Sequence, residues 1–291
     1  MATIFTQFLR KFKAPALPNS PLEYIRTDED QFRNILRLYF NQIDNALGSL
    51  LDTSGGKYIS FPTGAFYQDG VTTLTTGINN VSTADIVVAS TAQFVLTAGG
   101  FIIGTEIITY TGKTATTFTG ITRGAYGSTK SAHIAGATIT EAQTLASPTV
   151  AAPVAILQTT FSNGVALDAT DKTKVVFETA GIYNIQFSVQ MLSYDTTIDN
   201  VTLWFRKNGT DIAYSAGVAT VPAVHGGVAG TAIISWNLLE SFNSGDYLQL
   251  LFASDTGNTV CATYAGGTSP VHPVSPSVIL TATFVSALPV T

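Results

Sequence analysis

Three aspartates between Tyr194 and Ala213 are the residues of this chain best suited to acid–base or metal chemistry. Asp195, Asp199 and Asp211 fall near the expected ends of strands. Two carboxylates facing each other across a cleft can hydrolyse a glycosidic bond, and Asp195 and Asp199 with backbone carbonyls can bind Ca²⁺. Their spacing places no two of them on one face around a cleft. We therefore predict no catalytic site and no metal site, with a Ca²⁺ site as the minor alternative.

The chain has three histidines, and no two are close enough in the sequence to form a metal-binding pair. We expect His133 to fix a turn through a hydrogen bond. His225 and His272 lie in loop-like segments, where they are either plain surface residues or contacts for a ligand. The sequence contains no nucleophile elbow, phosphate-binding loop or dinucleotide fingerprint. These observations predict a protein that is not an enzyme and uses no cofactor.

The two tryptophans occur in different strand patterns. Trp236 shares a strand face with Ala232, Ile234 and Leu238, which predicts a place in the core or at a subunit interface. Trp204 falls on the face opposite Val201 and Leu203, so we expect an exposed or inter-subunit aromatic side chain. The residues predicted for the surface or an interface of the C-terminal part are Trp204, His225 and His272.

Composition narrows the function classes. Charged residues make up 11% of the 291 residues, against roughly 25% in ordinary soluble domains. A surface rich in Thr, Ser, Gly and Ala is common in extracellular and virion fibres, although an ordinary β protein fits nearly as well. Of the net charge of −5, residues 58–291 carry −6 and residues 1–57 carry +1, and an acidic body disfavours nucleic-acid binding. No apolar run reaches the length of a membrane span, and the single cysteine, Cys261, is expected to be a buried apolar filler.

Period-two alternation predicts a series of extended strands after the first 150 residues. From Tyr183 to Met191 apolar residues alternate with Asn, Gln and Ser over nine positions, which a helix cannot use. Asn208-Gly209 supplies the two positive-φ residues of a tight hairpin. An early strand around residues 61–67 is expected to complete the eight strands of a jelly roll. The other strands are expected at 156–161, 174–177, 183–191, 201–206, 232–239, 247–252 and 278–285.

A helix is predicted over residues 27–51. Thr27 is the expected cap, and the acidic residues that follow it suit the positive end of the helix dipole. The apolar spacing of 4, 3, 4, 3, 4 is a heptad seam, which indicates a trimer-forming or virion-anchoring helix; packing on the chain's own sheet is the alternative. The residues of this seam are Phe32, Leu36, Tyr39, Ile43, Ala46 and Leu50.

Four segments follow from these patterns. Residues 1–57 form an N-terminal attachment segment, which begins with a short amphipathic stretch over 2–13 and a proline-rich linker. Residues 58–80 form the first strand region of the jelly roll. Residues 81–143 form a small inserted β module, and residues 144–291 complete the jelly-roll head. The ends of the inserted module are expected to lie close together, because the first strand must still reach its sheet.

Two parts of the chain resemble known families. The strand at 181–190, the hairpin at 204–209, the turn at 245–248 and the last strand at 278–284 resemble, in this order, the tumour-necrosis-factor-like jelly roll found in complement globular heads. That family is almost always trimeric and binds rather than catalyses. The resemblance therefore implies an antiparallel jelly-roll sandwich and a homotrimer.

The inserted module carries a second resemblance. Its pattern is a glutamate-bearing strand before a tyrosine (Glu106 to Tyr110), a Thr-Gly pair, the turn Arg123-Gly124, and a closing Ala-His-x-x-Gly at 132–136. This pattern is similar to a small β module that recurs in structural proteins of tailed phages. The order of helix, strand, module and jelly roll resembles virion structural proteins of marine tailed phages.

From these resemblances we predict a virion structural protein, assembled in the host cytoplasm, that forms a homotrimeric tail fibre or spike. Its N-terminus would bind other phage structural proteins, and its jelly-roll head would contact a host-surface glycan or protein. A capsid or collar fibre or decoration protein is the runner-up, and an extracellular carbohydrate-binding module is the alternative from another class. A depolymerase tailspike is disfavoured, because no repeated rungs of a parallel β-helix occur in the sequence.

Overall fold

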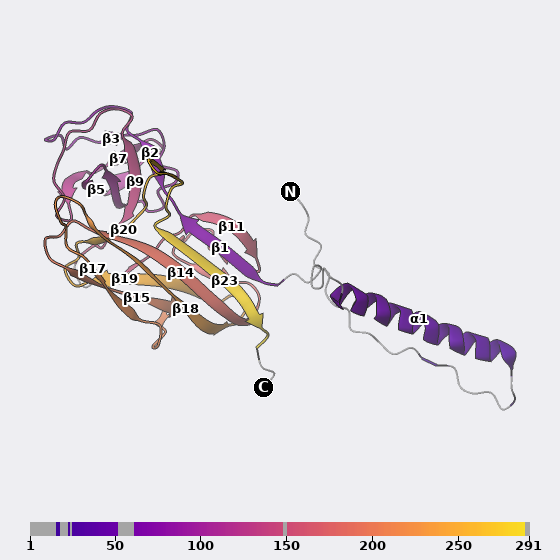
Figure 1. Cartoon of the computed structure of the whole chain (residues 1–291). Coiled ribbons are helices and arrows are strands. Elements are labelled where there is room, and N and C mark those ends of the chain that lie inside the picture. Colours follow the sequence, from indigo (N-terminus) through magenta and orange to yellow (C-terminus); the bar gives the residue numbers. More distant parts are fainter. Residues whose placement is uncertain (1–15, 18–22, 24, 52–60, 148–149, 289–291) are drawn as a thin grey trace. The chain divides into compact units, whose positions relative to one another are not determined.

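The computed structural model describes residues 16–17, 23, 25–51, 61–147 and 150–288 of the chain (Figure 1). The chain divides into two units, Met1–Phe61 and Pro62–Thr291, and each is described by itself. The amphipathic stretch over 2–13, the prolines of the linker and the end of the attachment segment lie outside the described residues. The described parts are mainly β, with half of the residues in strands and one helix near the N-terminus.

Helix α1 (Arg26–Leu51) confirms the helix predicted from the heptad spacing. It begins one residue early, because the carbonyl of Ile25 accepts the N–H groups of Asp28 and Glu29. Thr27 therefore lies inside the first turn and does not cap the helix. Arg33 forms an ion pair with Glu29 one turn away, at 2.9 Å, as expected for this spacing.

The head is a sandwich of two antiparallel sheets, the fold class that the sequence predicts. The first sheet runs in the order β11 (Gln158–Asn163), β1 (Thr63–Gln68), β23 (Val278–Ser286), β14 (Gly181–Ser193) and β18 (Gly230–Phe242). The second sheet runs β12 (Val165–Leu167), β13 (Val175–Phe177), β19 (Tyr247–Ser254), β15 (Asp199–Lys207) and β16 (Thr210–Asp211). Two short strands extend it, with β10 (Ala152–Pro153) on β19 and β17 (Gly217–Val221) on β15.

The core between the two sheets contains the inward-facing residues of the alternating strands. Tyr183, Ile185, Val189 and Met191 are fully buried, and Phe187 is nearly so. The polar residues between them point to the outer face of the first sheet. Aromatic contacts connect the two sheets: Phe187 packs edge-on against Phe205 at 5.2 Å, and Phe177 stacks on Phe242 at 3.6 Å between ring centroids.

The early strand belongs to the head, as the sequence predicts. β1 pairs with β11 along its length, and Gln68 at its end pairs with Val278 of β23. The expected hairpin also forms, because Asn208 and Gly209 have φ angles of 50° and 82° between β15 and β16. The positive φ at both positions is the geometry that Asn-Gly favours.

The inserted module is built from eight short strands around its own apolar core. These are β2 (Val71–Thr73), β3 (Ile86–Val87), β4 (Gly99–Ile103), β5 (Glu106–Tyr110), β6 (Gly112–Lys113), β7 (Thr117–Thr119), β8 (Thr122–Ala125) and β9 (Thr138–Gln143). Its core is rich in aromatic residues, with Phe118 packed against Phe94, Phe101 and Tyr110 at centroid distances of 4.6–4.9 Å.

The inserted module and the head share one sheet. β9 pairs with β20 (Thr259–Ala262), and β20 pairs with the last three residues of β14, so the first sheet continues into the module as 11 strands. A small core joins the two parts, with Ile107 and Ala142 from the module and Leu192 and Val260 from the head. The remaining strands, β21 (Gly267–Thr268) and β22 (Val271–His272), form a separate hairpin.

The packing of the module begins earlier than residue 81. β2 lies in the segment 58–80 that the sequence analysis gives to the head, but it pairs with β9 of the module. Leu74 and Ile78 also pack in the module's core. The reason is that β2 and β9 form an antiparallel pair that closes the module, which a reading of each strand alone does not reveal.

Candidate functional site

Two residues of the pattern in the inserted module, Glu106 and Arg123, form a buried ion pair. Arg123 donates two hydrogen bonds of 2.7 Å to Glu106, and both side chains are at most 1% exposed. The same guanidinium also donates to the backbone carbonyls of Asn79, Ser82 and Ser131. Burial opposes ionisation of Glu106, but the hydrogen bonds from Arg123 and other donors hold its pKa below the ordinary value.

His133 belongs to this cluster. Its Nε2 lies 2.8 Å from Glu106 Oε2, and its backbone pairs with Ile78. His133 therefore makes a hydrogen bond, but to Glu106 of β5 rather than within a turn, and its backbone bridges to the segment around Ile78. The cluster joins β5 and β8 to the segment around residue 80 and to the closing residues 131–133. The Glu106 and Arg123 side chains are at most 1% exposed and the His133 side chain is 9% exposed, so the cluster links these segments inside the module.

A second buried cluster lies where the module meets the head. Glu141 of β9 is 1% exposed and accepts hydrogen bonds from the Val95 N–H and from the Gln68 side chain. The other end of the Gln68 amide accepts the N–H of Leu157 at 2.9 Å. Burial raises the pKa of Glu141 to about 7, and the two hydrogen bonds and the charge of Lys113 oppose that rise.

The three candidate aspartates do not converge. Asp199 is fully buried and accepts from the hydroxyls of Ser193 and Thr259 at 3.1 and 2.6 Å. Asp195 accepts a hydrogen bond from Asn258 at 2.7 Å. Asp211 forms an ion pair with Arg206 at 2.6 Å, on the face of the second sheet opposite the buried Asp199. Among the described residues, no group of three or more His, Cys, Asp or Glu side chains is arranged to hold a metal ion.

The residues predicted for a surface or an interface are accessible but separate. Trp204 is half-buried on the outer face of the second sheet. The pKa of Asp211 is lowered mainly by Arg206 and to a smaller extent by the Trp204 side chain. His225 is exposed at one end of a tight turn and pairs with Val228. His272 is exposed on β22, with Nδ1 at 2.8 Å from the carbonyl of Pro273.

The heptad seam of α1 also stays accessible. Phe32, Leu36, Tyr39 and Ile43 are partly exposed, and no helix side chain that the structure describes is buried. The side chains of Ala46 and Leu50 lie outside the described residues. Large apolar side chains beside the seam, such as Phe40 at 61% exposure, extend the apolar surface of this helix.

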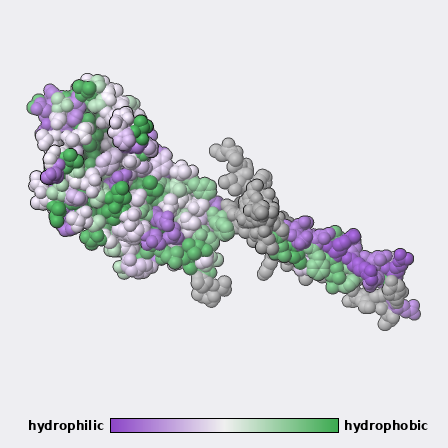
Figure 2. All heavy atoms as spheres, viewed as in Figure 1, coloured by the Kyte–Doolittle hydropathy of each residue, from purple (hydrophilic) through white to green (hydrophobic). Residues whose placement is uncertain are grey.

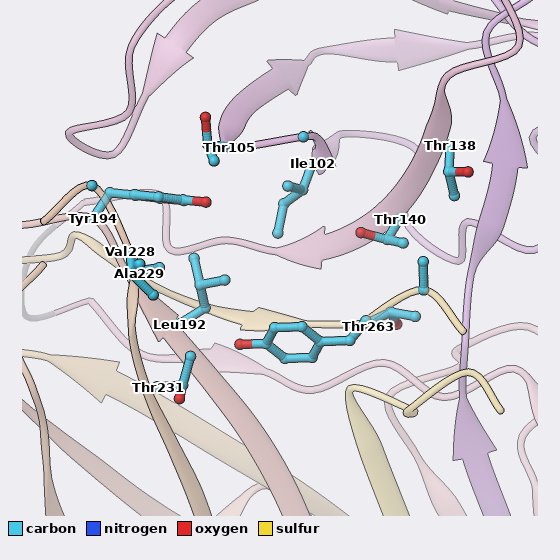
Figure 3. A pocket seen from close by; sticks show the side chains of 14 residues that line it. Ile102, Thr105, Thr138, Thr140, Leu192, Tyr194, Val228, Ala229, Thr231 and Thr263 are labelled. Carbon is cyan, nitrogen blue, oxygen red and sulfur yellow. The ribbon is translucent and has the colours of Figure 1, made fainter. Parts of the chain in front are cut away.

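A cleft of about 490 Å³ lies where the inserted module meets the head (Figure 3). Its floor is the shared sheet, with Ile102 of β4 opposite Thr140 of β9 and Leu192 of β14 opposite Thr231 of β18. Leu192 and Thr231 project from the outer face of the first sheet, the side opposite the sandwich core. The cleft therefore opens onto that outer face.

Four loop or strand-end segments form the walls of the cleft. Tyr194 follows the end of β14, Val228 lies in the turn after His225, Thr105 lies between β4 and β5, and Tyr264 follows β20. Figure 3 shows the Tyr194 ring extending from its strand end toward Ile102. None of the 14 side chains that line the cleft is acidic, basic or a histidine.

Several hydroxyl groups in the cleft are not used by the protein. Thr140 is only 7% exposed, yet no hydrogen bond joins its hydroxyl to any residue that the structure describes. The same holds, within the described chain, for the hydroxyls of Thr105, Thr231 and Tyr194. By contrast, the hydroxyls of Thr75 and Thr259 elsewhere in the fold have partners. Buried polar groups usually have a hydrogen-bond partner. The Tyr264 hydroxyl, which lines the cleft, is buried and has no partner among the described residues.

Sequence reasoning did not find this cleft. Its lining comes from β4, β9, β14 and β18 and from several loops, and no two neighbouring segments carry a recognisable motif. The one local signal is the pair Thr138 and Thr140, which share one face of a strand and both line the cleft.

Comparisons with protein-family models and with curated proteins found no match. Within the described residues, no helix is both long enough and apolar enough to cross a membrane.

Proposed function

We propose that this chain is a virion structural protein of a tailed phage, a homotrimeric fibre or spike without enzymatic activity. Its N-terminal unit would attach it to the particle, and its jelly-roll head would contact the host surface. The strand order of the first sheet and the closed module with its Glu106–Arg123 pair support the two resemblances on which this proposal rests. The observation that carries it is the outer face of the first sheet.

That outer face has the chemistry of a subunit interface. The five strands β11, β1, β23, β14 and β18 carry one charged residue, Glu240, and its alternation places it on the inner side. Large apolar side chains are exposed across the face: Ile233 at 71%, Leu239 at 56%, Val285 at 54%, Phe161 at 47% and Ile279 at 42%. Figure 2 shows apolar residues over β14, β18 and β23, beside a smaller hydrophilic patch on the same face.

A second copy of the chain is the partner that this face suits best. A face without charges can pack against an identical face or against the edge of a copy without like-charge repulsion. A hollow of about 410 Å³ between Ala65, Tyr67 and Ile279 could accommodate a protruding side chain of such a copy. Exposed apolar patches of this kind mark interaction sites in soluble proteins.

The test is the mass of the full chain in solution. We expect about three times 30.6 kDa by sedimentation or mass photometry. Ile233→Asp should reduce the trimer, because a carboxylate buried at an interface without a partner costs several kcal/mol, on the order of 3 or more. Val218→Asp on the second sheet is the matched control, since Val218 is 70% exposed and Ile233 is 71% exposed. A monomer at micromolar concentration, or equal effects of both variants, would contradict the trimer.

The virion location has its own test. Antibody against the head, viewed on purified particles by electron microscopy, should label the tail if the chain is a tail fibre. Labelling of the capsid or collar would favour the runner-up, a capsid or collar fibre or decoration protein. If the chain is absent from particles and found in the secreted fraction of a cell, the extracellular carbohydrate-binding module replaces the virion proposal.

A further inference from the structure

We propose that the cleft between the inserted module and the head binds an uncharged carbohydrate. This inference rests on the proposed function in one respect, that the head contacts a cell surface. It goes beyond that function by naming the site and the chemical class of the ligand. The argument uses the volume, the charge and the hydroxyl groups of the cleft.

The volume and construction of the cleft suit a small ligand. About 490 Å³ lies within the range of small-molecule sites, roughly 300–1,000 Å³. The floor consists of paired strands of one continuous sheet, so the positions of Thr140 and Leu192 are held by backbone hydrogen bonds. A site built on strands is pre-organised, which reduces the entropy that is lost on binding.

The lining excludes a charged ligand and favours one that is polar and apolar at once. No acidic, basic or histidine side chain lines the cleft, so neither phosphate nor carboxylate would find a counter-charge. Ile102, Leu192 and Val228 provide apolar surface, and the rings of Tyr194 and Tyr264 provide flat faces. A sugar ring has C–H faces that pack on such surfaces and hydroxyls around its edge.

The unpartnered hydroxyls match that edge. The Tyr264 hydroxyl is buried and has no hydrogen-bond partner among the described residues. The Thr140 hydroxyl also has no partner within the described chain. Figure 3 shows the Thr140 side chain beside Ile102, with the hydroxyl oxygen of Thr140 on the side nearer Ile102. A threonine hydroxyl can both donate and accept a hydrogen bond, as sugar hydroxyls do, so each free hydroxyl can be satisfied by one of the ligand.

The experiment uses the full chain and a printed array of neutral, sialylated and sulfated oligosaccharides, followed by titration of the strongest neutral probe. Thr140→Val keeps the shape of the side chain and removes only the hydroxyl, so affinity should fall about fivefold. Tyr194→Ala should reduce affinity about tenfold, because it removes the ring face as well. Thr202→Val is the matched control: Thr202 is a half-exposed strand threonine on the other sheet, and affinity should stay within about twofold.

Four results would overturn the proposal: no neutral sugar binds at millimolar concentration, only anionic glycans bind, the Thr140 and Tyr194 variants bind as tightly as the wild type, or Thr202→Val weakens binding as much as they do. Circular dichroism and thermal unfolding of each variant show whether a lost affinity reflects a lost fold. The mass of the assembly is measured separately. A monomer that still binds the sugar through Thr140 would remove the fibre proposal and leave the cleft site standing.

Discussion

At the residue scale, the pattern of the inserted module is explained by one buried cluster. Arg123 as a whole residue is 4% exposed. Its guanidinium donates to Glu106 and to the backbone carbonyls of Asn79, Ser82 and Ser131. Glu106 in turn accepts from the backbone of Gly124 and Ser131 and lies within hydrogen-bond distance of His133. The short strands of the module have few ladder hydrogen bonds, and this cluster joins their connecting loops.

Removing one partner of this pair should therefore destabilise the protein strongly. Arg123→Ala leaves the Glu106 carboxylate buried without its main counter-charge, and we expect a loss of about 3–5 kcal/mol in the free energy of unfolding. Chemical denaturation measures it. Arg206→Ala is the control, because the Arg206–Asp211 pair is 32% and 51% exposed and such pairs contribute less than about 1 kcal/mol. Equal losses for both variants would show that the cluster does not stabilise the module.

Glu141 should make stability depend on pH. Its pKa rises from 4.5 to about 7 on folding, so the folded state holds the proton more tightly than the unfolded chain. Stability from this group is present below about pH 4.5, falls as the pH rises to about 7 and is then constant. The change corresponds to on the order of 3 kcal/mol.

The comparison of wild type with Glu141→Gln isolates this effect. Glu106 has a lowered pKa and contributes in the opposite sense, losing stability as the pH falls. The free energies of unfolding of the two proteins are measured from pH 4 to pH 8. If Glu141 titrates as described, the difference between them should become smaller toward pH 4. A difference that does not change with pH would show that Glu141 keeps one charge state throughout.

At the scale of elements, helix α1 has an apolar seam that no described residue covers fully. Leu36→Asp with Ile43→Asp should weaken assembly or attachment, because two carboxylates would enter the proposed seam. Asn34→Asp with Asn41→Asp is the matched control, since these exposed residues have the same spacing and receive the same charge. Sedimentation reports assembly, and thermal unfolding of the head should be the same for both pairs. If assembly is unchanged when Leu36 and Ile43 are replaced, these residues face solvent and the seam does not bind a partner.

The long strand β14 links the elements of the head and the module. All 13 of its residues pair with β18 on one edge. On the other edge its first part pairs with β23 and its last three residues pair with β20. Because β20 then pairs with β9, one strand sets the position of the module on the head and, with it, the width of the cleft.

At the scale of the whole molecule, the choice of deletion decides whether the head survives without the module. The main core of the head contains no residue between 67 and 144, so it should fold without the module's core. Replacing residues 75–136 with a short Gly/Ser turn keeps β2 paired with β9, since Leu74 already exchanges backbone hydrogen bonds with 136 and 137. We expect a cooperative thermal transition for this variant.

Replacing residues 82–142 should behave differently. It removes Glu141 and nearly all of β9, which leaves β20 without its neighbour and the Gln68 amide without its carboxylate. A buried polar group left without its partner costs about 1–3 kcal/mol, and an uncovered strand edge promotes aggregation. Recovery of this variant as a stable, cooperatively unfolding head would show that the shared sheet contributes little to the fold.

The sequence by itself determined the local features of this protein. Period-two alternation assigned Tyr183, Ile185 and Phe187 to the core, and all three are buried. The Asn208-Gly209 pair determined its hairpin, and the heptad spacing determined the helix within one residue at its start. These features depend on neighbours along the chain, because side-chain direction repeats every 2 residues in a strand and every 3.6 in a helix.

Only the tertiary structure decided which strand edges meet. Pairing β9 with β20 brings Gln68 beside Glu141 and merges the module with the head, and nothing in either segment names its partner. The pairing of β2 with β9 moves the beginning of the module to Val71, and the pairing of β9 with β20 creates the cleft around Thr140. The physical reason is that sheet hydrogen bonds join backbone groups that are alike in every strand. The choice of partner therefore depends on the packing of the whole chain, which no local pattern records.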